Sequence, residues 1–296
     1  MRHRRIGERT VSAIGLGCMP LSVRDRPDPD QSVATIHAAA ERGITLLDTA
    51  DAYHEFAGEV GHNEELIRTA LGRLGPDRQH LVVATKGGLL RPGDGSWVQD
   101  ARPEHLAAAA RASARRLGVE RIDLYQLHRP DPAVPFEDSL GALSELRQEG
   151  IIDGIGLSNV TTEQIRTAHR LLGGALVSVQ NRFNPEDLSS YPELLLCAEL
   201  GLAFLPWSPL ARPGSGHVES PHELTALATE LQVSVYQVIL AWELALAEIV
   251  IPIPGARRPA TISDSAGAAD LDLSPVQVSA LTAAFTTGRE MPSPIN

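Results

Sequence analysis

Short apolar segments alternate with longer segments of helical period along the whole chain. The apolar segments are rich in β-branched residues and predict strands at 14–18, 45–50, 81–86, 122–128, 153–158, 176–182, 202–208 and 249–254. Apolar positions that recur every three or four residues predict helices at 31–42, 62–74, 103–117, 136–149, 161–172, 187–200, 221–246, 259–268 and 275–286, with the longest broken near Val233. The pattern predicts eight strand and helix units in succession.

Strands that are separated by helices run parallel, because each helix returns the chain to the end at which the previous strand began. Eight such units in 296 residues match a (β/α)8 TIM barrel, which needs about 250 residues plus additions. An open doubly wound sheet is the competing α/β fold. No composition break or linker divides the chain, so we expect one barrel domain over residues 1–296 with a short C-terminal tail.

Composition and charge narrow the class of protein. Apolar residues make up 43% of the chain and charged residues 21%, which suffices for a large core without cross-links. The 26 basic and 37 acidic side chains give a net charge of −11, which disfavours nonspecific binding to nucleic acid or to an anionic membrane. Cys18 and Cys197 are too few for a disulfide framework and favour a reducing compartment. Without a signal sequence or a membrane-spanning apolar run, we expect a cytoplasmic protein.

Polar residues gather where the predicted strands end. In a barrel this is the face on which the βα loops build the functional site. The residues at these ends are Asp48 with Tyr53 just beyond, Lys86, His128, Ser158 with Asn159, Gln180, Trp207 with Ser208, and the segment 255–258. A single polar strand end is ordinary, but the coincidence across seven strands indicates a site.

Lys86 is the only lysine in a chain whose other basic residues are arginines. It ends an apolar strand, where an ammonium needs a counter-ion, and Asp48 ends the neighbouring strand at the same layer. A lysine cation stabilises a phenolate, so we expect Lys86 to lower the pKa of Tyr53 and to make it a proton donor. His128 ends the next strand, where we expect it either to orient a carbonyl oxygen or to share the proton. The residues together predict a carbonyl-activating tetrad.

The motifs around these residues resemble those of the aldo-keto reductases, in order and over nearly the whole chain. They are the segments Gly43–Tyr53, Gly61–Ile67, Ala84–Lys86, Ile122–His128, Gly156–Asn159, Gln180–Asn181 and Trp207–Leu210. The resemblance implies NADPH-dependent reduction of an aldehyde or ketone, with Tyr53 as general acid. It implies that Lys86 and Asp48 tune this acid, that His128 lies beside the substrate oxygen, and that no metal takes part.

The resemblance also assigns the cofactor, NADPH in preference to NADH. It implies that Ser158, Asn159 and Gln180 bind the carboxamide, that Trp207 stacks on the nicotinamide, and that Ser208, Pro209 and Leu210 lie along the pyrophosphate. It implies that the 2′-phosphate and the adenine are bound by Gly255, Ala256, Arg257, Thr261, Asp264 and Ser265. We also expect Cys18 and Met19 to contact the cofactor. Arg257 and Arg258 are adjacent in an acidic protein, which independently suits a phosphate dianion.

The chain departs from the family pattern in two places. Many members have arginine or glutamine at the position of Thr261, and commonly Glu-Asn at the positions of Asp264 and Ser265. These differences imply weaker contacts with the adenine. The segment 211–220 is shorter than the loop that closes over the pyrophosphate in many relatives. For the substrate pocket we expect Tyr53, His128, Phe56 and Trp97, with the tail after Gly288 closing its wall.

Two other functions compete with carbonyl reduction. A Schiff-base aldolase would use Lys86 as nucleophile, but it leaves Tyr53, Trp207 and the amide residues without a role. A nucleotide-binding regulatory module would resemble the β subunits of potassium channels. The sequence indicates a small carbonyl compound as partner and names no protein partner.

Overall fold

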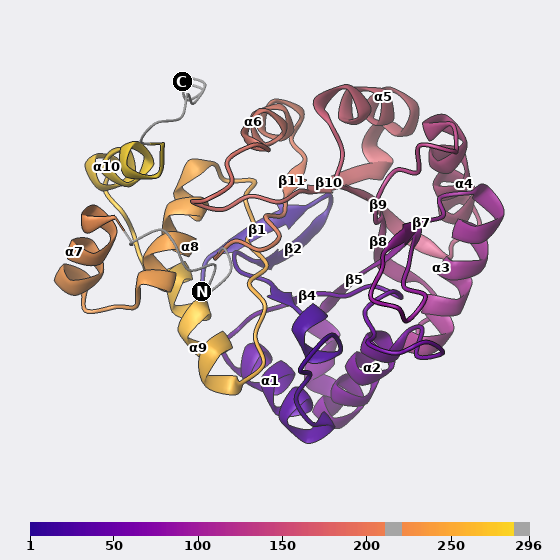
Figure 1. The fold of residues 1–296 in the computed structure, drawn as a ribbon, viewed down its shortest axis with the longest axis horizontal. Helices are drawn as coiled ribbons and strands as arrows, with labels where there is room; N and C mark the ends of the chain where they lie inside the picture. The colour runs from indigo at the N-terminus through magenta and orange to yellow at the C-terminus, as the bar shows by residue number, and fades with distance from the viewer. Residues whose placement is uncertain (211–220, 287–296) are drawn as a thin grey trace.

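A curved sheet of parallel strands encircled by helices forms the centre of the molecule (Figure 1). The computed structural model describes residues 1–210 and 221–286. Its main sheet has the strand order β11-β10-β9-β8-β5-β4-β3. These strands are β3 (Leu16–Gly17), β4 (Leu46–Asp48), β5 (Val82–Gly87), β8 (Ile122–Leu127), β9 (Ile152–Ser158), β10 (Leu176–Gln180) and β11 (Ala203–Phe204). Neighbours follow one another along the chain, as the predicted (β/α)8 fold requires, and the prediction is confirmed.

The predicted eighth strand, 249–254, is wrong as a strand, although the segment fills the eighth position of the ring. Pro252 and Pro254 have no N–H to give to a ladder, so only part of the hydrogen-bond pattern of a strand forms here. Their carbonyl groups still accept hydrogen bonds from Gly15 N at 2.9 Å and Gly17 N at 3.0 Å. The segment therefore connects the last strand to the first and closes the ring.

Ten helices, all within the described ranges, follow the strands and pack around the sheet. They are α1 (Pro29–Glu41), α2 (His62–Leu74), α3 (Pro103–Leu117), α4 (Phe136–Gln148), α5 (Thr162–Leu172), α6 (Tyr191–Leu200), α7 (His222–Leu231), α8 (Val235–Leu246), α9 (Pro259–Gly267) and α10 (Pro275–Thr286). Most bounds agree with the predicted ranges within a few residues. The helix predicted from residue 187 starts later, at Tyr191.

The break that we predicted near Val233 separates α7 from α8. Gln232 has a left-handed backbone with φ of 58°, and the Ser234 hydroxyl accepts the Gln237 N–H at 3.1 Å and caps α8. The two helices are bent by 101° relative to each other. Within the described residues no single helix is long and apolar enough to cross a bilayer. Among them, only the bent pair of α7 and α8, taken together, has the length and apolar composition of a membrane span.

The sequence analysis missed two hairpins. One joins β1 (His3–Ile6) to β2 (Arg9–Ser12) and lies across the middle of the ring in the view of Figure 1. Its buried Ile6 and Val11 belong to the same apolar cluster as inward residues of the barrel strands. The other joins β6 (Leu89–Leu90) to β7 (Val98–Gln99) in the loop after β5. It carries Trp97 to the face where the strands end.

Candidate active site

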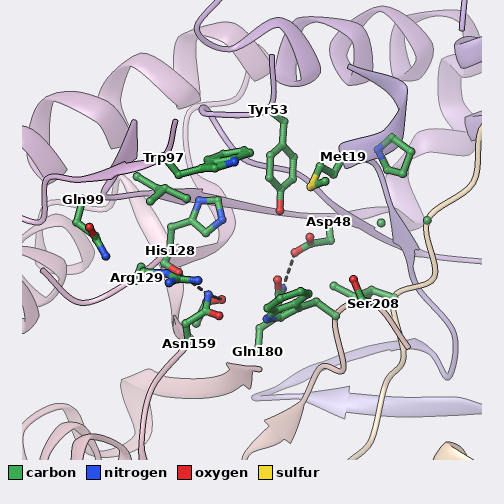
Figure 2. Close-up of a pocket in the computed structure, with 17 residues that line it drawn as sticks. Met19, Asp48, Tyr53, Trp97, Gln99, His128, Arg129, Asn159, Gln180 and Ser208 are labelled. Carbon is green, nitrogen blue, oxygen red and sulfur yellow. Dashed lines mark hydrogen bonds between the residues drawn. The ribbon is translucent and has the colours of Figure 1, made fainter. Parts of the chain in front are cut away.

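A cavity of about 410 Å³ opens where the parallel strands end (Figure 2). Hydrophobic and polar groups share its wall, which is typical of a site for a small molecule. Eleven of the residues predicted for the site line it: Met19, Asp48, Tyr53, Trp97, His128, Ser158, Asn159, Gln180, Trp207, Ser208 and Gly255. The rule that barrel sites form at strand ends therefore located the cavity from the sequence.

Lys86 lies behind the cavity wall and is completely buried. Its ammonium donates to Asp48 Oδ2 at 2.7 Å, to the Thr49 carbonyl at 2.9 Å and to the Tyr53 hydroxyl at 3.0 Å. These acceptors satisfy the three N–H donors of the ammonium. Burial opposes the charge, but Asp48 and Tyr53 outweigh it and raise the pKa of Lys86. The side chain is a fixed cation next to a phenol.

The register of the sheet brings the acid partner of Lys86 into place. Asp48 ends β4 and pairs with Ala84, two residues before Lys86, so both side chains point to the same face. The other carboxylate oxygen of Asp48 accepts Gln180 Nε2 at 2.8 Å and Gln126 Nε2 at 3.2 Å. The carboxylate is thus held by one cation and two amides.

The expected direction of the Tyr53 pKa is wrong. Burial raises this pKa above its ordinary value, and the nearby Lys86 cation offsets only part of that effect. The phenol therefore keeps its proton at neutral pH. Its hydroxyl lines the cavity, and Lys86 Nζ also lies 4.9 Å from the centre of its ring.

His128 follows β8 directly and faces Tyr53. Their rings meet edge to face, with centroids 5.7 Å apart and planes at 83°. Burial, helped by the charges of Lys86 and Arg129, lowers the pKa of His128 well below its ordinary value, so the ring is neutral. Its Nδ1 is buried and makes no hydrogen bond to any described residue. The other ring nitrogen is the one left to serve the cavity.

Amide groups form the opposite wall. Asn159 has a left-handed backbone with φ of 58°, which asparagine tolerates well, and the turn brings its side chain back to the cavity. Its Nδ2 donates to the His128 carbonyl at 3.0 Å and to Ser158 Oγ at 2.9 Å. The amide N–H groups of Asn159 are thus used within the protein, as are those of Gln180, which donate to Asp48. Their amide oxygens remain free, among the described residues, to accept from a ligand.

Several predicted site residues do not line this cavity. Phe56 is 56% exposed on the loop after Tyr53 and lies beside Arg26, whose guanidinium is 5.6 Å from the ring centre. The others outside the cavity wall are Cys18, Pro209, Leu210, Ala256, Arg257, Thr261, Asp264 and Ser265. The segment 211–220 and the tail after Gly288 lie outside the described residues.

On α9, two of the predicted adenine contacts are engaged inside the protein. Asp264 accepts the Ser234 hydroxyl at 2.7 Å and Gln237 Nε2 at 3.0 Å, and the Ser265 hydroxyl donates to the Thr261 carbonyl at 3.2 Å. The Asp264 contacts tie α9 to the start of α8, and the Ser265 bond lies within α9.

Arg257 lies in the loop before α9 and bridges to the loop after β3. Its Nη2 donates to the Arg24 carbonyl at 2.8 Å and its Nε to the Pro20 carbonyl at 3.3 Å. Arg258 is exposed and precedes α9 as its N-cap residue. Of the five N–H donors of an arginine, Arg257 uses two for these carbonyls, and no residue in 1–210 or 221–286 accepts from the other three.

Sequence reasoning missed Gln126 and Arg129. Gln126 lies within β8 beside Lys86 in register, and Gly156 makes room for it, since a Cβ there would lie 2.7 Å from Gln126 Cγ. The period of two along a strand could have found it, because Gln126 and His128 share a face. Arg129 lines the cavity directly after His128. Its position at a strand end was the available signal.

The cavity lies at the carboxyl ends of the barrel strands with a lysine and tyrosine pair in its wall, which is the arrangement of a barrel enzyme. The model of the Aldo/keto reductase family matches residues 13–285. An uncharacterized oxidoreductase of Schizosaccharomyces pombe is 36% identical over 275 residues, which are 91% of this chain and 85% of that protein. This chain belongs to the aldo/keto reductase family, whose enzymes act on carbonyl and alcohol groups with a nicotinamide cofactor.

Solved structures agree. The glycerol dehydrogenase of Gluconobacter oxydans superimposes with a TM-score of 0.84 at 27% identity, covering 99% of this chain and 97% of that one. An aldo-keto reductase of Klebsiella pneumoniae, solved in complex with NADPH, gives a TM-score of 0.80 at 25% identity, with coverage of 100% and 98%. The resemblance drawn from the sequence motifs is thus confirmed at the level of family and fold.

Proposed function

We propose that this protein reduces an aldehyde or ketone to the alcohol with NADPH, with Tyr53 as the general acid. The observation that carries the proposal is the Tyr53 hydroxyl, which lines the cavity while the buried Lys86 ammonium lies 3.0 Å behind it. A proton donor at a carbonyl oxygen accelerates reduction because negative charge develops on that oxygen.

Burial and the lysine have complementary effects on Tyr53. Burial keeps the phenol protonated in the resting site, so that it holds a proton to give. Lys86 then stabilises the phenolate that remains after the proton moves to the substrate oxygen. Asp48, with the two glutamine amides, holds the lysine in position. Lys86 and Asp48 thus act through Tyr53.

His128 contributes a second hydrogen bond. A neutral imidazole carries one N–H, and an unpaired buried acceptor is less costly than an unpaired buried donor. Since Nδ1 is buried without a partner, we assign the proton to Nε2, on the cavity side. There it donates to the carbonyl oxygen and orients it beside Tyr53.

The cavity fits a nicotinamide. Its carboxamide has an N–H₂ group that Asn159 Oδ1 and Gln180 Oε1 can accept, and a carbonyl that the Ser158 hydroxyl can reach as donor. Trp207 offers an aromatic face in the same wall. When bound, the reduced nicotinamide supplies the hydride.

The preference for NADPH over NADH is part of the proposal and depends on Arg257. Its free N–H donors lie on the loop beyond Gly255, which lines the cavity. The NADPH in the Klebsiella pneumoniae relative supports the same cofactor. We assign Ser208, Pro209 and Leu210 to the pyrophosphate, with the residues of α9 beside the adenosine.

We further propose that residues 1–296 act as one domain and that the protein is cytoplasmic. Residues that line the cavity are spread along the described chain from Gly17 to Gly255, as expected of a single domain. Cys18 and Cys197 are both buried and unpaired, in keeping with a reducing compartment.

The decisive experiment is a turnover screen of aldehydes, ketones and quinones with NADPH, followed as loss of NADPH absorbance. Steady turnover of at least one carbonyl compound, with the alcohol as product, supports the proposal. Cofactor binding without any turnover contradicts it and favours the regulatory module. Covalent trapping of substrate on Lys86 by borohydride favours the aldolase, although the three hydrogen bonds of this ammonium leave it poorly placed as a nucleophile.

A further inference from the structure

The loop after β8 brings an unpaired cation to the active-site cavity. Arg129 is exposed, lies beside His128 and Asn159, and lines the cavity (Figure 2). It also lines a neighbouring cavity of about 370 Å³, and Asn159 is shared by both. Throughout 1–210 and 221–286, no residue forms an ion pair or a hydrogen bond with its guanidinium. Arg129 is therefore available to a ligand that enters either cavity.

The acidic residues near Arg129 do not neutralise its charge, so its guanidinium can bind an anion. Asp48 also lines the cavity, but the Lys86 ammonium neutralises it at 2.7 Å. Asp131, two residues beyond Arg129, accepts the Ala133 N–H at 2.9 Å and forms no ion pair with the arginine. The charge of Arg129 is felt at the reacting centre, where it contributes to keeping His128 neutral.

We propose that Arg129 sets the substrate class, and that the substrate is a carbonyl compound with a carboxylate a few atoms from the carbonyl. The inference rests on the proposed carbonyl reduction. A guanidinium offers two parallel N–H donors that match one carboxylate. The apolar side chains of Leu89 and Trp97 in the cavity wall suit the hydrocarbon that separates the two groups. In a protein of net charge −11, a local cation is also what draws an anionic substrate to this mouth.

Matched aldehydes test the proposal directly. The kcat/KM with NADPH is measured for 3- and 4-carboxybenzaldehyde and for their neutral methyl esters, so that each pair differs in the negative charge and in one methyl group. We expect the wild type to prefer the better acid over its ester by about 10- to 100-fold, the scale of one charge-assisted pair. Arg129→Gln should bring this ratio close to one, mainly through the KM of the acid.

Charge reversal gives a second arm. Arg129→Glu should invert the preference, so that a trimethylammonio-benzaldehyde becomes a better substrate than the carboxylate. High salt should reduce the wild-type preference, because ions screen exposed charges. Arg166→Gln is the matched control, since Arg166 is an exposed arginine on α5 outside both cavities, and it should keep the wild-type ratio.

The outcomes separate this inference from the proposed function. No turnover of any carbonyl compound in the wider screen, these acids and esters included, overturns carbonyl reduction itself. Turnover of the esters without a wild-type preference for either acid overturns the role of Arg129 alone. An equal loss for acid and ester in Arg129→Gln also overturns it, because that result places the arginine in cofactor binding or in folding.

Discussion

The ammonium of Lys86 lies 3.0 Å from the hydroxyl of Tyr53, with no water-accessible surface of its own. One partner lines the cavity and the other is sealed behind it, so the cation reaches the substrate only through the phenol. This arrangement assigns proton transfer to Tyr53 and charge stabilisation to Lys86. Removing either partner should therefore affect catalysis in a different way.

Tyr53→Phe removes the proton donor and keeps the ring. We expect turnover of an aldehyde to fall by roughly 100-fold or more, the scale of a missing general acid. NADPH binding, measured by quenching of protein fluorescence, should persist, because the substitution changes none of the residues that we propose for the carboxamide and the adenosine. Near wild-type turnover by this variant would rule out Tyr53 as the acid.

Lys86→Arg keeps a positive charge but changes its shape. The guanidinium is larger and planar, and it cannot reproduce the three bonds of the buried ammonium to Asp48, Thr49 and Tyr53. Turnover should fall nearly as far as in Lys86→Met, by roughly 100-fold. Circular dichroism checks that both variants are folded. An active arginine variant would mean that charge alone matters at this position.

The sequence predicted most of the barrel because its signals are strong and local. β5 is buried along its whole length and begins with the apolar run Val82-Val83-Ala84, and α10 was predicted with its observed bounds, 275–286. The first hairpin was missed because β1 and β2 are short and rich in arginine. The eighth strand failed for a chemical reason, since two prolines leave its ladder incomplete.

The residues of the site that lie at strand ends could be predicted from the sequence. Asp48, Tyr53, Lys86 and His128 meet as expected because parallel strands bring their carboxyl ends to one face. The pKa of Tyr53 was not predictable, because it depends on how far burial outweighs the nearby lysine. Such a balance requires three-dimensional coordinates.

Glu243 on α8 makes the free energy of unfolding depend on pH. It is fully buried, and neither of its carboxylate oxygens has a hydrogen-bond partner in the part of the chain that the structure describes. Burial raises its pKa well above the ordinary 4.5. Above about pH 4.5 the unfolded chain therefore loses a proton that the folded protein retains, so the free energy of unfolding falls as the pH rises toward the folded-state pKa.

Glu243→Gln should remove the contribution of this carboxyl to the pH dependence. The free energy of unfolding of the variant, minus that of the wild type, should therefore be larger at pH 8 than at pH 5. Glu243→Leu should be more stable than wild type at pH 8 by about 1–3 kcal/mol, because it also removes a buried polar group without partners. Urea unfolding at both pH values measures the differences. If wild type and Glu243→Gln respond equally to pH, Glu243 is not the group that titrates.

Arg257 tests the cofactor preference, because NADPH and NADH differ only in the 2′-phosphate. The guanidinium is held by the Pro20 and Arg24 carbonyls and keeps further N–H donors free. A charge-assisted hydrogen bond contributes roughly 1.5–3 kcal/mol, and about 1.4 kcal/mol corresponds to a factor of ten. Arg257→Ala should therefore raise the KM for NADPH by about 10- to 100-fold.

The same substitution should leave the KM for NADH nearly unchanged, since NADH has no phosphate at this position. Arg258→Ala is the matched control: the neighbouring arginine is exposed, occupies the N-cap position of α9 without a side-chain capping hydrogen bond, and should have a smaller effect. Steady-state constants for both cofactors are measured for the three proteins. Equal losses with NADPH and NADH in Arg257→Ala, or a wild type that prefers NADH, would show that the 2′-phosphate is not bound here, because only a contact with that group distinguishes the two cofactors.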